Sequence, residues 1–396
     1  MKPSIAFLFV SLLLASSSIA QHTPPQWMTQ GPYLGNETSS FEIPVQVMAS
    51  KIYVEVELGG KPRRFVFDTG SPSMIDKTLA QELGLQVVGK SKGQDSHGNI
   101  IESNIVQTSI NIGGTIMNKV PMFAADFAGS TATNCFIGDG VLGSELLPLG
   151  AWQIDLNKGV IRFNTDVTHM PSLGHATKTQ LHSFGYTHTP FLDVQFARRA
   201  RSKAMFDTGS PAYFAISTAD LEGARNAKGV GNTNSGFGSA GGSLGGQAAN
   251  ADQLQVELKA LAIDNLKLGR VGAIQRELSP SLIGAAMLKH FVVTLDIKSE
   301  AAYFNQYADG GFSHPSFGFS LAFEGEVYVA AVWDNSPAQA AGIRPGLRFT
   351  EINGVKPAFT CQGIQQALNA MQADELNLVW ATGSATLSRK TSILEK

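Results

Sequence analysis

Cysteine is scarce in this sequence, with only Cys135 and Cys361 among 396 residues. A fold held together by several disulfides, as in small secreted domains, is therefore excluded. One disulfide could still form in an oxidising compartment, but the simpler expectation is two separate buried thiols.

Charge is also sparse, because charged residues make up 16% of the chain and its formal net charge is −2. Nucleic-acid binding needs a basic face, and no run of Lys and Arg supplies one, so no nucleic-acid partner is expected. His182 and His188 lack further ligands at metal-binding spacing and are interpreted as linker residues. No metal or other cofactor is expected, and no nucleophilic Ser or Cys motif is present.

Long hydrophobic runs are missing except at the N-terminus. There Lys2 precedes an apolar run over residues 5–15, and the small residues Ser18 and Ala20 follow. This order predicts a signal peptide, residues 1–20, cleaved after Ala20. The run is shorter than the ~20 residues that span a bilayer, so no membrane anchor is expected in the mature chain. We expect an exported protein, periplasmic or secreted.

The string Phe-Asp-Thr-Gly-Ser-Pro is present twice, at residues 67–72 and 206–211. If Asp68 and Asp207 meet at ~3 Å, their charges repel by roughly 5 kcal/mol at an effective dielectric of ~20, so the pair shares one proton. The ionised member can then take a proton from water while the protonated member donates one to a carbonyl oxygen. This is the chemistry of peptide hydrolysis without a metal or a covalent intermediate.

The flanks of the two strings are also parallel, which indicates an internal duplication. Alternating residues before each string predict a hairpin leading into each Asp, and short helices are expected at residues 73–83 and 217–224. Farther along, Val141-Leu142-Gly143 is matched by Leu282-Ile283-Gly284. Gly143 and Gly284 are expected where a second backbone approaches the Asp loop.

Residues 51–307 resemble the pepsin-like and retropepsin-like aspartic peptidases. The resemblance is carried by two features, each present twice: a hydrophobic residue before Asp-Thr-Gly-Ser, and a later hydrophobic-hydrophobic-Gly triplet. The resemblance implies an all-β fold of two homologous β-barrel lobes, residues 51–168 and 169–307, acting on peptide or protein substrates as a monomer. It implies that Asp68 and Asp207 form the catalytic pair. It also implies three pairs of supporting residues. Thr69 and Thr208 would hydrogen-bond across the lobe interface, and Gly70 and Gly209 would permit the turn. Ser71 and Ser210 would hydrogen-bond the outer carboxylate oxygens.

The segment that would form the flap over the cleft departs from pepsins. Residues 93–100 contain no tyrosine, and His97 is the only aromatic residue at the expected tip. We interpret His97 as a solvated loop residue rather than a substrate contact. Residues 229–247, rich in Gly, Ser and Asn, are expected to form a mobile loop at the edge of the cleft.

The C-terminal segment, residues 313–385, resembles a PDZ domain of the kind attached to bacterial exported proteases. The resemblance is carried by Ser336-Pro337-Ala338, Ala341-Gly342-Ile343, Pro345-Gly346 and Ile352-Asn353-Gly354. It implies that the Phe317-Gly318-Phe319 loop offers backbone N–H groups to the C-terminal carboxylate of a peptide ligand. The alternative is a unit that only packs on the rest of the chain.

Together these features predict an exported bacterial aspartic endopeptidase followed by a small PDZ domain. One alternative is a catalytically silent adaptor that binds peptides with the same cleft and PDZ domain. The intact second string argues against it, because a silent half could lose Asp207. Residues 21–50 are predicted to be a linker or a short prosegment, and they contain no basic cluster to neutralise the two aspartates.

Overall fold

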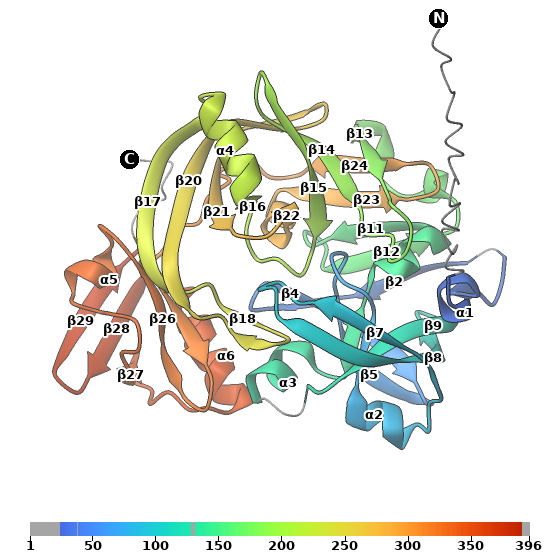
Figure 1. The fold of residues 1–396 in the computed structure, drawn as a ribbon, viewed down its shortest axis with the longest axis horizontal. Coiled ribbons are helices and arrows are strands. Elements are labelled where there is room, and N and C mark those ends of the chain that lie inside the picture. Colours follow the sequence, from blue (N-terminus) through green and yellow to red (C-terminus); the bar gives the residue numbers. More distant parts are fainter. Residues whose placement is uncertain (1–23, 38, 128–130, 390–396) are drawn as a thin grey trace, which may run out of the picture.

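The structure is a computed structural model that describes residues 24–37, 39–127 and 131–389. The predicted signal peptide lies outside these residues. In the described part, strands predominate and form a nine-stranded and a fifteen-stranded sheet, with short helices at their margins (Figure 1). No helix within these ranges is long and apolar enough to cross a membrane.

The first sheet contains the first Asp turn. β4 and β5 form an antiparallel hairpin, and β10 pairs with β5 in parallel, so that Leu142 lies opposite Phe67. β7 and β8 form a second hairpin that extends from the sheet. The strands are β1 (Tyr33–Leu34), β3 (Gln46–Met48), β4 (Lys51–Leu58), β5 (Lys61–Phe67), β6 (Met74–Asp76), β7 (Val87–Gln94), β8 (Ile100–Ile112), β9 (Thr115–Ala125) and β10 (Gly140–Leu142).

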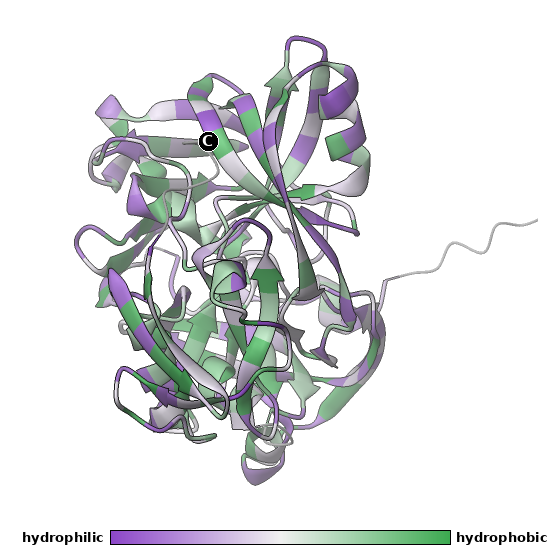
Figure 2. Ribbon diagram, turned by 90° about the vertical axis from the view of Figure 1, so that its left-hand side faces the viewer, coloured by the Kyte–Doolittle hydropathy of each residue, from purple (hydrophilic) through white to green (hydrophobic). Residues whose placement is uncertain are grey.

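The second Asp turn has the same surroundings within the larger sheet. β14 and β15 form its hairpin, and β22 pairs with β15 in parallel, with Gly284 opposite Asp207. The strands are β14 (Phe191–Ala197), β15 (Ala200–Asp207), β16 (Phe214–Ser217), β17 (Val230–Ser239), β20 (Asn250–Ile263), β21 (Leu266–Arg276) and β22 (Ser281–Gly284). Burial alternates strictly along β14, and Figure 2 shows hydrophobic and hydrophilic residues alternating along several strands, as expected for sheets that bury one face.

Strands that follow each Asp turn in the sequence pair with each other and so connect the two parts of the structure that bear the turns. β11 pairs with β23 antiparallel, with Trp152 opposite Leu295 and Ile154 opposite Val293. Gln153 donates a hydrogen bond to the Thr294 hydroxyl at this junction (3.0 Å). The strands are β2 (Ser40–Pro44), β11 (Ala151–Asp155), β12 (Val160–Asn164), β13 (Thr177–His182), β23 (Phe291–Asp296) and β24 (Ala301–Gln306).

Two local expectations are corrected by hydrogen bonding. The predicted helix at residues 73–83 is β6 followed by α2 (Lys77–Glu82), because the Asp76 carboxylate caps the N–H groups of Thr78 and Leu79 and so starts the helix late. The predicted mobile loop at residues 229–247 is largely strand, since β17 pairs with β20 along its length. Only its tip forms a small hairpin, β18 (Gly242–Ser243) with β19 (Gly246–Gln247).

The remaining short helices occupy the margins of the sheets. They are α1 (Gln26–Thr29), α3 (Thr131–Ile137), α4 (Thr218–Asn226) and the 3-10 helices at Ser144–Leu149, Val167–His169, Leu173–His175 and Ala285–Lys289. α4 begins one residue after its predicted start because Ser217 is its cap and accepts the N–H of Asp220.

The C-terminal segment is a small β/α unit with its own hydrophobic core, which includes Phe317, Phe319, Val329 and Leu376. Its elements are β25 (Phe319–Phe323), β26 (Val327–Trp333), α5 (Pro337–Ala340), β27 (Phe349–Ile352), α6 (Cys361–Ala370), β28 (Glu375–Trp380) and β29 (Gly383–Ser388). β26 pairs with β17, which makes this unit continuous with the large sheet (Figure 1).

The expectation of two separate thiols is wrong, because Cys135 in α3 and Cys361 in α6 form a disulfide. The two cysteines are 226 positions apart, and the contact between α3 and α6 has no local sequence signal. Phe136 and Phe323 stack edge to face beside it (5.9 Å). The C-terminal unit is thus fastened on one side to β17 and on the other to α3.

We predict that Cys361→Ser lowers the free energy of unfolding by about 2–5 kcal/mol, because the bond closes a very long loop in the unfolded chain. Urea denaturation with and without reductant measures this loss. Reductant should destabilise the wild-type protein and leave the Cys135→Ser/Cys361→Ser variant unchanged. Equal stability of the oxidised and reduced wild type would contradict the prediction.

Candidate active site

The two Asp-Thr-Gly turns lie against each other. Asp68 directly follows β5, and Asp207 is the last residue of β15. A Cβ atom added to Gly70 would overlap the Asp207 carboxyl, and one added to Gly209 would overlap the Asp68 carboxyl. The structure therefore brings the two predicted aspartates together, and both glycines are required by this close approach.

Four hydrogen bonds made by Thr69 and Thr208 lock the two turns together. Each hydroxyl donates to the carbonyl that precedes the opposite Asp, Thr69 to Phe206 (2.6 Å) and Thr208 to Phe67 (2.9 Å). Each hydroxyl also accepts the backbone N–H of the other threonine (3.0 and 3.1 Å). Both side chains are fully buried, so no water competes for these groups.

The carboxylates are also oriented by their own turns. The N–H of Gly70 donates to Asp68 Oδ1 (2.9 Å), and the N–H of Gly209 donates to Asp207 Oδ1 (2.8 Å). Burial and, second, the negative charge of Asp68 raise the pKa of Asp207 to about 7. The pair therefore holds one shared proton under mildly acidic conditions.

The expected serine contacts with the carboxylates are not both present. The Ser71 hydroxyl donates to the Pro72 carbonyl (3.2 Å) rather than to Asp68. At Ser210 the backbone N–H, not the hydroxyl, donates to Asp207 Oδ1 (3.2 Å). The Ser71 backbone carbonyl accepts the N–H of Ser144 (2.9 Å) in the returning segment.

Gly143 and Gly284 lie where the sequence placed them. A Cβ on Gly143 would overlap the backbone of Pro72 and Ser73, and a Cβ on Gly284 would overlap the Ala212 carbonyl. Both glycines therefore let a returning strand pass directly behind an Asp turn.

Sequence reasoning missed Glu145, which lies behind the first turn. Its carboxyl is buried and accepts the N–H of Ser73 at both oxygens (2.9 and 3.1 Å), and burial raises its pKa to about 7. Tyr186 lies close enough that the Glu145 charge adds to burial in raising the tyrosine pKa. The sequence did contain a signal for this residue, because Glu145 is the one charged residue in the otherwise largely apolar stretch at residues 141–149.

The tips of two hairpins meet and form a roof, which we define as residues 95–99 and 243–245. Asp95 Oδ2 accepts the Ser243 hydroxyl (2.6 Å) and the Gly245 N–H (3.0 Å), while Oδ1 accepts the N–H groups of His97 and Asn99. These hydrogen bonds outweigh desolvation and lower the pKa of Asp95 to about 2. His97 is partly buried, with Nδ1 enclosed and lacking a hydrogen-bond partner, so it is not the solvated residue we expected.

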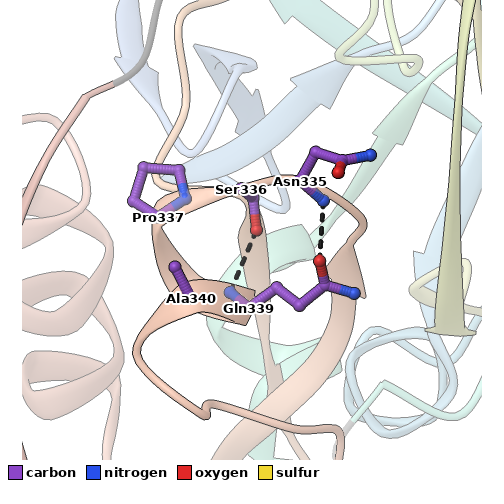
Figure 3. Close-up of a pocket in the computed structure, with 5 residues that line it drawn as sticks. All are labelled: Asn335, Ser336, Pro337, Gln339 and Ala340. Carbon is purple, nitrogen blue, oxygen red and sulfur yellow. Dashed lines mark hydrogen bonds between the residues drawn. The ribbon is translucent and has the colours of Figure 1, made fainter.

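The Phe317-Gly318-Phe319 loop, which was predicted to bind a peptide, makes most of its contacts within the C-terminal unit itself. Both phenylalanines are buried in the core of the C-terminal unit. The Gly318 N–H donates to the Ser316 hydroxyl (3.2 Å), and the Gly318 carbonyl accepts the N–H of Trp333 (2.8 Å). Beside this loop, a shallow depression of ≈ 550 Å³ at the start of α5 is lined by Asn335, Ser336, Pro337, Gln339 and Ala340 (Figure 3).

The two histidines interpreted as linker residues, His182 and His188, each lie beside a polar side chain. His182 Nε2 is 2.9 Å from Asp193 Oδ2, and Lys203 binds the same carboxylate. His188 Nδ1 is 3.4 Å from the Ser183 hydroxyl. Among the described residues, no group of three or more potential metal ligands gathers.

Comparison with known proteins supports one part of this site. A family model described as "Aspartyl protease" matches residues 54–146, from β4 through the first Asp turn to the segment after Gly143. These residues are aspartyl protease-like. Basic 7S globulin from soybean is a similar solved structure, with 10% sequence identity and a TM-score of 0.44 over 68% of this chain and 96% of that one. No curated protein sequence matches the chain.

We predict that Thr69→Val lowers stability by about 1–3 kcal/mol for each buried group left unsatisfied, because valine has the same shape but no hydroxyl. The Phe206 carbonyl and the Thr208 N–H would both lose their partner. Thr69→Ser keeps the hydroxyl and is the matched control. Urea denaturation that shows equal losses for Val and Ser would mean that packing, not hydrogen bonding, holds the turns.

Proposed function

We propose that this chain is an exported aspartic endopeptidase in which residues 51–168 and 169–307 form two homologous lobes. The observation that carries the proposal is the reciprocal Thr69–Thr208 lock, which holds Asp68 and Asp207 against each other. Both aspartates come from one chain, so a monomer suffices.

In this proposal the pair acts as acid and base at once. The ionised carboxylate removes a proton from a water molecule, which attacks the scissile carbonyl carbon, and the protonated carboxyl donates its proton to the carbonyl oxygen. Because the pKa of Asp207 is raised to about 7, its proton is present below that pH and lost above it. Peptide cleavage should therefore decline as the pH rises through about 7.

We predict that Asp68→Asn and Asp207→Asn each lower kcat/KM by at least about a thousandfold, because each change removes one half of the acid–base pair. The assay is cleavage of a mixed peptide pool by the purified chain without residues 1–20. Asp252→Asn, at an exposed strand position, is the control and should retain full activity.

Thermal unfolding must show that the Asn variants are folded. Substantial cleavage by either variant would overturn the proposal. A wild-type protein that binds peptides but cleaves none would instead support the silent adaptor.

We also propose that residues 313–385 form a PDZ domain that binds substrate C-termini. The support is a separate core and an outer strand, β25, that lies at the end of the large sheet with one edge unpaired by another strand. An extended peptide can add to such an edge. Truncation is a poor test of this role, because the unit is bonded to β17 and to Cys135.

We predict that peptides with a free, apolar C-terminus bind the Asp68→Asn protein at least about tenfold more tightly than the same peptides with an amidated C-terminus. Amidation removes the charge that backbone N–H groups would hold. Fluorescence anisotropy of labelled peptides measures the difference. Equal affinities would leave the C-terminal unit with a structural role only.

A further inference from the structure

Two cationic side chains from different strands interact electrostatically with Asp207. Lys51, the first residue of β4, donates from Nζ to the Gly209 carbonyl (2.5 Å). Gly209 is the glycine that lies against the Asp68 carboxyl, and the positive charge of Lys51 acts on the Asp207 carboxyl. Arg276, the last residue of β21, is close enough to interact electrostatically with Asp207. Both side chains are partly buried.

Neither cation is neutralised by an ion pair within the described ranges. Lys51 bonds a carbonyl, and Arg276 donates from a terminal nitrogen to the Pro280 carbonyl. Other arginines of the chain, such as Arg162 and Arg348, lie against carboxylates. If the aspartate pair shares one proton, its single negative charge faces two positive charges, which leaves an excess of one positive charge.

Neither Asp95 nor Glu277 forms an ion pair with Lys51 or Arg276 in the described structure. Asp95 in the roof has both oxygens engaged by N–H and O–H donors. Glu277 follows Arg276 but is exposed and has no ion pair in the part of the chain that the structure describes. An acidic side chain from a bound peptide could supply the missing negative charge.

Lys51 is not required for the turn itself. In the first hairpin Tyr53 pairs with Val66, and in the second Phe191 pairs with Met205, so Lys51 corresponds to Thr189 by strand register. The second turn therefore forms with an uncharged residue at this position. The Lys51 ammonium is therefore a feature of the first hairpin that the second hairpin lacks.

We propose that Lys51 and Arg276 are specificity-determining residues that select peptides with an acidic side chain near the scissile bond. This inference rests on the proposed peptidase function. Both cationic side chains are partly buried, and opposite charges attract more strongly in such a position than in bulk water. A glutamate in the bound peptide would gain this attraction, and the uncharged glutamine of the same shape would not.

The test compares peptide pairs that differ only by Glu or Gln at each of about three positions on either side of the cleaved bond. At one position or more, the wild-type protein should cleave the Glu peptide with at least about tenfold higher kcat/KM. The ratio should shrink as salt is added, because ions screen the attraction. Glu:Gln ratios near or below one at every position would overturn the inference.

Variants separate charge selection from structural bracing. Lys51→Met and Arg276→Met should each move the Glu:Gln ratio toward one, whereas Lys51→Arg should keep the preference. A role limited to bracing the Gly209 carbonyl would lower both rates equally and leave the ratio unchanged, which would contradict the inference. Lys61→Met, at an exposed lysine of β5, is the matched control and should not change the ratio.

Binding provides a second readout that does not depend on cleavage. The Asp68→Asn protein should bind the favoured Glu peptide more tightly than its Gln partner by fluorescence anisotropy. If the wild-type protein cleaves nothing, the proposed function fails, but this binding difference still supports the charge selection. Equal binding of every pair overturns it. Cleavage without any preference defeats only the inference and leaves the peptidase proposal standing.

Discussion

The exchange of hydrogen bonds between Thr69 and Thr208 is the constraint on which the arrangement of the site depends. Two buried hydroxyls satisfy two carbonyls and two N–H groups that would otherwise be enclosed without partners. Such groups are costly to bury unpaired, so the two turns are held in one relative position. The contact of each Asp with the opposite glycine, and the proton sharing that follows, depend on this position.

The surroundings of the two turns are similar but not equivalent. Glu145 lies behind the first turn, and the corresponding position after Gly284 is Ala286. The roof also joins unlike hairpins, since the one that bears Ser243 continues through β17 into the C-terminal unit. Two chemically identical carboxyl groups therefore experience different fields, which is what separate acid and base roles require.

The parts of the site that could be predicted from the sequence are those encoded by short strings. Asp68 and Asp207, their threonines and Gly143 and Gly284 follow from repeated residues at matched spacing, and each lies where it was expected. What could not be predicted are contacts between distant segments. Asp95 reaches Ser243 across 148 positions, Lys51 reaches Gly209 across 158, and Cys135 reaches Cys361 across 226.

Local chemistry explains the smaller errors as well. Ser71 was expected at the carboxylate, but its hydroxyl donates instead to the adjacent Pro72 carbonyl. The stretch at residues 229–247 looked like a loop because glycine and polar residues are poor strand formers. Its strand pairing comes instead from two neighbours, β20 and β26, which a local composition cannot reveal.

The disulfide has a topological consequence for the two aspartates. It closes residues 135–361 into a covalent ring that contains Asp207, whereas Asp68 lies on the open N-terminal arm. A single backbone break inside the ring leaves every segment covalently attached. A break between Asp68 and Cys135 leaves the first aspartate joined to the second only by non-covalent contacts. The two aspartates are thus unequally protected against proteolytic nicking, and the vulnerable span includes the β7–β8 hairpin.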